Sequence, residues 1–205
     1  STGDIAINAN TTAAGNESFT QNATGTITTG STGANAVKIL VNTASAGTGG
    51  AALRDITTGS GGTITVNTAQ GNATGGSITQ TAATLLNAGT GTVALTTGGA
   101  ASGIGSSGAN ILTTAGTITA ASGTGGIFIT ESDGANFTAN VSGATGNMAL
   151  ASSTGTLNIA GASATGGGTI TLSSADAITL GAALGSGSTG DIAINANTTA
   201  AGNES

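Results

Sequence analysis

Large aliphatic residues recur along the chain in short alternating triplets, with a small or polar residue between each pair. Ile5-Ala6-Ile7, Ile64-Thr65-Val66 and Ile170-Thr171-Leu172 are examples. Alternation with a period of two places both apolar side chains on one face of an extended strand. Ile, Val and Thr favour that conformation because β-branched side chains fit a pleated surface. Clusters of Gly, Ser, Asn and Thr between the triplets indicate turns. The pattern predicts an all-β chain of short strands.

The triplets recur at a nearly constant interval in the C-terminal half. From Ile129, equivalent positions follow at Leu150, Leu172 and Ile194, so the residue number increases by 21 or 22 in each cycle. A second series, which begins at Phe137, interleaves with the first at about the same spacing. Each cycle therefore carries at least two strands. Between residues 85 and 118 the spacing is irregular, and it assigns no strand positions there.

A cycle of this length, with an inward aliphatic face on each strand, is typical of a parallel β-solenoid. One coil cannot bury its apolar face alone, whereas stacked coils make one continuous core. Parallel crossovers favour right-handed winding. We therefore predict a right-handed β-solenoid (β-helix) of about 21–22 residues per coil and roughly 9–10 coils. The alternative, an antiparallel β-sandwich, predicts aperiodic spacing.

We expect the inward residues of the triplets to form the core stack. These candidates are Ile5, Ile7, Ile27, Ile64, Val66, Ile127, Ile129, Met148, Leu150, Leu157, Ile159, Ile170, Leu172, Ile178, Leu180, Ile192 and Ile194. Two large apolar residues, Leu40 and Phe128, alternate to the outward face. They are candidates for lateral contacts between rods; the alternative is that they pack under a loop or against a second layer.

The composition fits a narrow rod with little chemistry on it. Gly, Thr, Ala, Ser and Asn occupy 155 of the 205 positions, and 5% of the residues are charged. Few residues are large and apolar, which borders on the composition of disordered chains. However, Pro is absent, charge is low and the apolar residues are patterned, so we expect a folded chain.

The residue types that the chain lacks argue against most enzymes. It has no Cys, His, Trp or Tyr, and Lys38 and Arg54 are its only cations beside eight acids. The usual zinc, haem and iron–sulfur ligands are therefore missing, as are a basic face for nucleic acid and an aromatic platform for bases or sugars. No apolar run is long enough for a membrane helix. We predict no enzyme activity, no cofactor, no metal site, no nucleic-acid partner and no membrane insertion.

Residues 1–18 and 188–205 both read STGDIAINANTTAAGNES. The identity defines one repeat unit over 1–187 and the start of the next over 188–205. Because the unit is close to nine coils of the predicted length, we expect the second unit to begin at the same phase of the coil as the first. Neither end shows an amphipathic helix, a charged tail or Pro, so both ends are expected to be uncapped. The chain is then a segment of a tandem array, or a subunit that joins copies of itself head to tail.

Runs such as GTITVNTAQGNATGGSIT (62–79) and GTLNIAGASATGGGTITLSSADAITLGAAL (155–184) resemble the repeats of filamentous-haemagglutinin-like large exoproteins. The resemblance covers nearly the whole chain. It implies a long right-handed β-helix in a secreted bacterial protein, exposed at the cell surface or outside the cell. It further implies a role as a β-strand-repeat adhesin, with a surface ligand on a host or neighbouring cell that the sequence does not name.

Three motifs suggest more specific chemistry. GTIT occurs at 25–28, 62–65, 116–119 and 168–171, and stacked Thr-x-Thr pairs order water on some ice-binding solenoids. The offsets of 37, 54 and 52 are not common multiples of 21 or 22, so we interpret these Thr as outward neighbours of an inward Ile. Two G-x-G-x-x-G matches, beginning at Gly103 and Gly185, precede no helix and are interpreted as turns. Glu131 and Asp133 form a carboxylate pair with no third acid nearby, which we interpret as surface charge.

Together these features predict a structural protein. We expect a non-catalytic segment of a very long extracellular fibre or adhesin shaft, whose partners are neighbouring copies of the same repeat. The first alternative is a subunit that stacks head to tail into a homopolymeric filament. The second is an ice- or glycan-binding solenoid, which requires the outward Thr or acidic residues to form one flat ladder.

Overall fold

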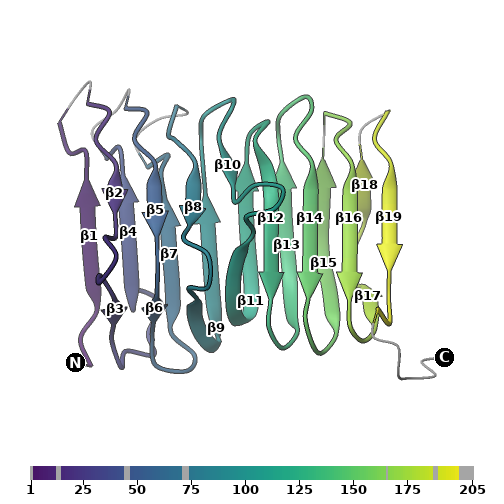
Figure 1. Ribbon diagram of the computed structural model, residues 1–205, viewed down its shortest axis with the longest axis horizontal. Helices are drawn as coiled ribbons and strands as arrows, with labels where there is room; N and C mark the ends of the chain where they lie inside the picture. Colours follow the sequence, from purple (N-terminus) through teal and green to yellow (C-terminus); the bar gives the residue numbers. More distant parts are fainter. Residues whose placement is uncertain are drawn as a thin grey trace.

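The computed structural model describes residues 2–12, 15–43, 47–70, 74–164, 166–186 and 189–198. Within these ranges the chain forms strands without helix, and every strand-to-strand pairing within the sheet is parallel. The strands stack side by side along a rod (Figure 1). The fold is the parallel β-solenoid that the triplet pattern predicts.

The strands stack in three columns, which we call the first, second and third faces. The first face contains β1 (Ile5–Ala9), β4 (Val37–Val41), β7 (Thr63–Asn67), β9 (Leu86–Thr96), β11 (Ile111–Ser122), β13 (Ala135–Val141), β15 (Leu157–Ala164), β17 (Ile178–Leu180) and β18 (Leu184–Ser186). The second face contains β2 (Phe19–Thr20), β5 (Ala51–Leu53), β8 (Ile78–Gln80), β10 (Gly103–Ile104), β12 (Gly126–Glu131), β14 (Met148–Ser152), β16 (Ile170–Ser174) and β19 (Ile192–Asn195). The third face begins with β3 (Ile27–Thr28) and β6 (Ile56–Thr57) and continues through the first halves of β9 and β11.

Alternation along each strand builds the core. In β4 and β13 every second residue is buried, and the residues between them point outward. Because inward residues of one strand pair with inward residues of the next, the inward residues of successive coils stack in rows. One row on the first face runs through Ile5, Val37, Ile64, Val93, Ile118, Phe137, Ile159 and Leu180.

The coil length is not constant, and the predicted number of coils is wrong. Near the N-terminus, one step along this row leads from Ile5 to Val37, whereas near the C-terminus it leads from Ile159 to Leu180. The interval that the sequence predicts therefore holds only for the C-terminal half. Since the early coils are longer, the chain makes fewer coils than the nine or ten predicted.

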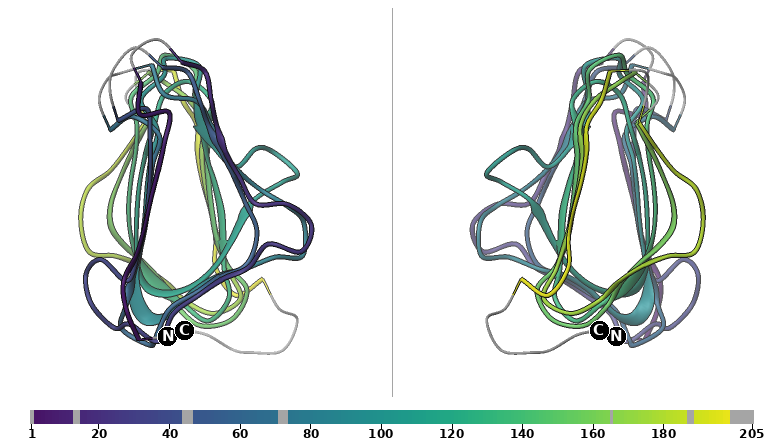
Figure 2. Two further views of the ribbon diagram at one scale, coloured as in Figure 1. Left: turned by 90° about the vertical axis from the view of Figure 1, so that its left-hand side faces the viewer. Right: turned by 90° about the vertical axis from the view of Figure 1, so that its right-hand side faces the viewer.

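The coils shorten because the turn between the second and third faces disappears. Ile104 and Ile111 are separated by a loop that carries an isolated bridge between Ser106 and Ala109. In the next coil their partners are Ile127 and Ile129, with one residue between them in the continuous strand β12. The early loops protrude from the rod when it is viewed along its axis (Figure 2). A three-sided coil thereby becomes a two-sided one.

The irregular stretch 85–118 is where this change occurs. β9 and β11 each run through the corner between the third and first faces as one long strand. Gly89 makes the corner in β9 with a φ of 57°, a conformation that costs glycine little. The register between β9 and β11 shifts at this point. Because each of these strands continues through a corner and contributes to two faces, the apolar pairs on either side of the corner are not separate strands, and the sequence spacing fails there.

Burial of the expected core residues depends on their position along the rod. Ten are buried: Ile64, Val66, Ile127, Ile129, Met148, Leu150, Leu157, Ile159, Ile170 and Leu172. Ile5, Ile7, Ile27 and Ile178 are half-buried and pack against the core. Leu180, Ile192 and Ile194 are 48%, 44% and 47% exposed, because they lie in the last described coil. These three continue the rows of the stack, opposite Ile159, Ile170 and Leu172, and have no described coil beyond them.

The two copies of the repeated sequence lie on opposite faces, so the predicted phase is also wrong. Ile5 in β1 belongs to the first face, whereas its repeat equivalent Ile192 in β19 pairs with Ile170 on the second face. Figure 2 shows β1 and β19 on opposite sides of the rod. The copies adopt the same local conformation, since Asn10 and Asn197 have φ angles of 49° and 52°. The proposed boundary between residues 187 and 188 lies outside the described residues.

Candidate functional site

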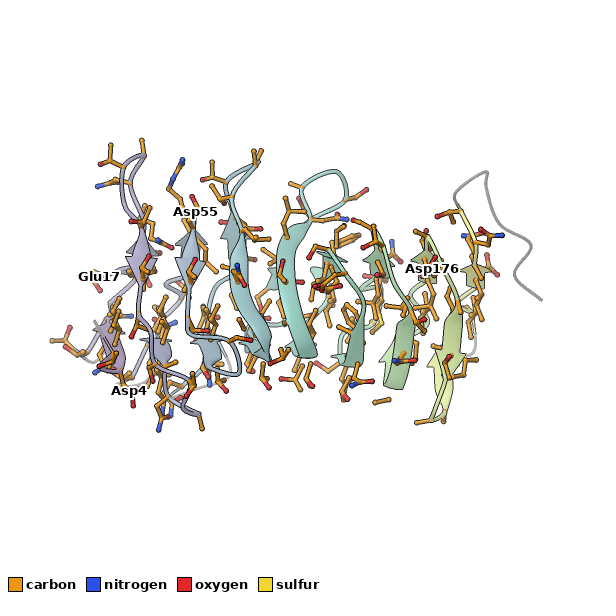
Figure 3. The ribbon with its side chains drawn as sticks, turned by 90° about the horizontal axis from the view of Figure 1, so that it is seen from below. Asp4, Glu17, Asp55 and Asp176 are labelled. Atoms are coloured by element: carbon orange, nitrogen blue, oxygen red, sulfur yellow. The ribbon has the colours of Figure 1, made fainter. Side chains whose placement is uncertain are left out.

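Some of the described acids bind backbone amides at turns. Asp4, Glu17, Asp55 and Asp176 are spread along the rod in Figure 3 and do not converge. Asp55 accepts a hydrogen bond from Leu85 N (2.9 Å), and Asp176 accepts one from Gly155 N (3.0 Å). Within the described residues, no group of three His, Cys, Asp or Glu side chains is placed to hold a metal ion. No helix long and apolar enough to cross a membrane occurs among them.

The expectation that Glu131 and Asp133 are both surface charges is wrong for Glu131. Its side chain is buried at 0% exposure, although Asp133 is exposed. The Glu131 carboxylate accepts hydrogen bonds from Ala115 N (3.2 Å), Asp133 N (2.7 Å) and Gly134 N. It therefore closes the turn after β12 and ties that turn to the preceding coil.

Burial raises the pKa of the Glu131 carboxyl above 4.5, and the nearby Asp133 side chain raises it further, while the three backbone amides oppose the shift. A raised pKa in a cleft would suggest acid–base chemistry. Here the inward neighbours of Glu131 in the adjacent coils are Thr113 and Ser152, which are also buried. The group sits in a packed corner and has a structural role.

A second polar corner lies at the end of the first face. Asn42 has a φ of 62° and is fully buried. Its Nδ2 donates to Gly49 O (2.8 Å) and Thr68 O (2.7 Å), and its Oδ1 accepts from Asn10 Nδ2 (2.5 Å) and Gly49 N (3.2 Å). One side chain thus joins three successive coils. The Oδ1 of Asn10, in the first coil, is buried without a hydrogen-bond partner.

The outward side of β7, β9, β11 and β13 is a regular array of small polar side chains, which we call the threonine–asparagine face. It has three rows, which run through Thr63, Thr92, Thr117 and Asn136; Thr65, Ala94, Thr119 and Thr138; and Asn67, Thr96, Ala121 and Asn140. Ten of these twelve positions are Thr or Asn, and none is charged.

The array is bounded on both sides. The neighbouring strand β4 presents Lys38 and Leu40 outward, and β15 breaks the register with a bulge opposite Phe137 and Thr138. A hollow of about 200 Å³ opens beside Ala121, where the row of larger side chains is interrupted. Past this bulge only the first row continues with Asn and Thr, through Asn158 and Thr179, so the full three-row array does not run the length of the rod.

The structure corrects the interpretation of the GTIT motifs in part. The motifs at 62–65 and 116–119 share the first face, with Thr63 and Thr117 in one row on either side of Thr92. Two of the longer coils separate them, so their offset matches the actual coil length and not the predicted one. The motifs at 25–28 and 168–171 lie in β3 and β16, on the other faces. Half of the motifs therefore stack.

The remaining candidates from the sequence are two outward apolar residues and two glycine motifs. Leu40 and Phe128 are both half-buried and lie on different faces, so they form no common patch. The glycine motif from Gly103 spans β10 and its loop, where Gly105 and Gly108 have φ angles of 65° and 87°. It is a turn, as interpreted. In the second motif, Gly185 lies in β18 and Gly187 lies outside the described residues.

Sequence reasoning missed two features of this surface. The buried Glu131 could not be recognised, because an acid in a Gly- and Ser-rich turn gives no sign of which way it points. The threonine–asparagine face was hidden by the assumption of a constant coil length. A test of the GTIT offsets against longer coils in the N-terminal half would have found it.

Comparison of the chain with family models, with curated proteins and with solved structures finds no match.

Proposed function

We propose that the chain is a non-catalytic structural segment of a very long extracellular fibre or adhesin shaft, of the kind built by filamentous-haemagglutinin-like exoproteins. The observation that carries the proposal is the stack of parallel strands that runs along the rod, combined with the identity of the sequence at 1–18 with that at 188–205. Hydrogen bonds that run along the rod axis suit a shaft, because the backbone groups of each strand hold one coil to the next.

The surface of the rod agrees with such a role. Some of the described acids bind backbone amides at turns, the core is an aliphatic stack, and the outward residues are small and mostly uncharged. Such a surface exposes few sites to trypsin, since Lys38 and Arg54 are the only basic residues. Resistance to proteases is an advantage outside the cell.

The size and location of the native polypeptide test this proposal. An antibody raised against the purified chain is used on intact source cells and on a denaturing gel. We expect surface labelling and a band far larger than the 18.7 kDa of this chain. Labelling only after lysis, or a band that corresponds to a single unit, would contradict the proposal.

A second candidate function is ice binding, favoured by the threonine–asparagine face. Adjacent strands in such a face are about 4.8 Å apart, and alternate residues along a strand are about 6.6 Å apart. The array is a two-dimensional grid of hydroxyl, methyl and amide groups with no charge on it. A grid of that kind can order water into a lattice, whereas glycan binding generally uses aromatic rings, which the array lacks.

Thermal hysteresis tests the second candidate. Thr117→Tyr places a bulky ring in the middle of the array, and Thr171→Tyr places the same ring outward on β16 of the second face. If the array binds ice, the parent chain and Thr171→Tyr shape ice crystals, and Thr117→Tyr loses most of the hysteresis. Absence of hysteresis in the parent chain, or an equal effect of both substitutions, would exclude ice binding by this face.

A further inference from the structure

The repeated sequence occupies two different faces of one continuous rod. Ile5 begins a row of inward residues on the first face, and seven coil steps along that row lead to Leu180. Ile192, the repeat equivalent of Ile5, follows Leu180 after 12 residues and stacks on Ile170 of the second face. Twelve residues are about half of a two-sided coil, so the copy begins about seven and a half coils after the original.

The corners that follow the two strands agree with this half-coil difference. Asn10 and Asn197 are equivalent in the repeat and have nearly the same φ, 49° and 52°. Asn10 follows β1 at the corner that ends the first face, where its Nδ2 donates to Asn42 Oδ1 (2.5 Å). Asn197 follows β19 at the corner that ends the second face, where its backbone N donates to Asp176 O (2.8 Å). The turn has therefore moved to the opposite corner together with the strand.

The connections inside the repeat unit, and not its ends, set this difference. Each coil of a solenoid stacks on the one before it, so the length of its connections decides which face the next strand reaches. The connections shorten where Ile104 and Ile111, which a loop separates, are followed by Ile127 and Ile129 in one strand. Units of identical sequence contain the same connections, so each unit turns through the same number of coils before the next begins.

We propose that successive repeat units of the shaft are related by a half-turn about its axis. The second face of one unit continues into the first face of the next, because β19 stacks on β16. These two faces are the long, opposite sides of the rod in Figure 2. Since neighbouring coils are about 4.8 Å apart, about seven and a half coils give a rise of about 36 Å for each unit. Every second unit then has the same orientation.

The half-turn makes the threonine–asparagine face two-sided. This face lies on β7, β9, β11 and β13, so it occurs once in each unit and moves to the opposite side in the next. On either side of the shaft its copies recur every second unit, about 72 Å apart. Such a shaft can contact flat, uncharged surfaces on both sides at once, whereas units of whole coils would present every copy on one side. The inference deepens the proposed function and rests on it, because it describes how units follow one another in a single polypeptide.

Disulfide trapping in the full chain tests the position of the second copy, and the natural absence of Cys removes any background. Thr171 pairs with Ala193, and paired positions on neighbouring strands lie within the range of Cα separations that a disulfide spans. The matched control combines Ala193→Cys with Thr179→Cys, an exposed position on β17 of the first face. Under mild oxidation, Thr171→Cys/Ala193→Cys is expected to form at least ten-fold more intramolecular disulfide than the control. Equal amounts, or more in the control, would overturn the half-coil difference.

The helical symmetry of the native material, measured by cryo-electron microscopy, tests the half-turn itself. The expected symmetry is a rise of about 36 Å and a rotation of about 180° for each unit, on coils about 4.8 Å apart. Units that repeat after whole coils, with no rotation between them, would overturn this inference and leave the proposed shaft intact. Particles of a single unit would contradict the proposed shaft and overturn the inference with it.

Discussion

At the scale of single residues, the Glu131 carboxylate lies inside the solenoid, where burial raises its pKa above 4.5 and three backbone amides hold it in place. Because the folded pKa is the higher one, the folded state binds the proton more tightly than the unfolded state. The contribution of Glu131 to the free energy of unfolding is therefore fully present below about pH 4.5 and is lost as the pH rises through the folded pKa. The side chain of Asp133 is the other titratable group that contributes to this shift of the Glu131 pKa.

Glu131→Gln removes this dependence while it keeps an oxygen acceptor in the corner. The free energy of unfolding of the parent chain, relative to Glu131→Gln, is expected to fall between pH 4.5 and 7.5. The fall is about 1.4 kcal/mol for each pH unit between the unfolded and folded pKa values. Denaturant titrations at both pH values measure it, with Asp191→Asn as an exposed control. If the free energy of unfolding of the parent chain, relative to Glu131→Gln, rises between pH 4.5 and 7.5, the pKa of Glu131 is shifted in the opposite direction and the account is contradicted.

Phe137 and Phe128 allow an inward aromatic ring to be compared with an outward one. Phe137 is among the largest fully buried side chains, whereas Phe128 is half-buried. Phe137→Ala is expected to lower the free energy of unfolding by about 3–5 kcal/mol through the cavity it leaves, and Phe128→Ala by much less. Hydrogen exchange should localise the loss to β11, β13 and β15, because coils depend mainly on their neighbours. A similar loss from both variants would contradict the assigned orientation.

The direction of each side chain could largely be predicted from alternation alone. Ile64 and Val66 are inward and Thr65 is outward, as the period of two requires. The exposure of Leu180 and Ile192 could not be predicted, because it depends on the end of the stack. The burial of Glu131 could not be predicted either, since it depends on a turn that bonds to the preceding coil through Ala115.

At the scale of strands and turns, the same residue types form both short and long connections, and this limits what the sequence can show. The strands are recognisable because β-branched residues alternate in them. The length of a coil is not, since Gly, Ser, Ala and Asn compose the extended loop of 105–110 as readily as such residues compose a tight turn. At the bend beside β2, the side-chain amide of Gln21 accepts from Arg54 N (2.9 Å) and donates to Asp55 O (3.2 Å). At this bend the side chain of Gln21 makes the hydrogen bonds between coils that backbone groups make within the strands.

The corner in β9 depends on close approach between coils. A Cβ added to Gly91 would lie 2.0 Å from the carbonyl oxygen of Gly62 in the preceding coil, so the backbone would have to shift. Gly91→Ala is expected to destabilise the rod by about 1–3 kcal/mol. Gly185→Ala in β18 is the control, since a Cβ there meets nothing within 4 Å. Thermal unfolding compares the two; an equal effect would mean that the coils are not packed as described.

At the scale of the whole molecule, the change from three-sided to two-sided coils sets the phase of the repeat. The first coil extends from Ile5 to Val37, and a late one only from Leu157 to Ile178, so the repeated strand returns on the opposite face. The class of fold follows from the triplets, and the repeat follows from the identity of 1–18 with 188–205. The face on which the repeated strand lies follows from neither, because it depends on the length of every connection along the rod.

Cryo-electron microscopy of the native material tests the central claim, that this chain is a length of a continuous solenoid shaft, most directly. The account predicts unbranched filaments one solenoid wide, with a repeat of about 4.8 Å along the filament axis from strands that lie across it. Compact particles with the mass of a single unit, or filaments whose strands run along the axis, would contradict it.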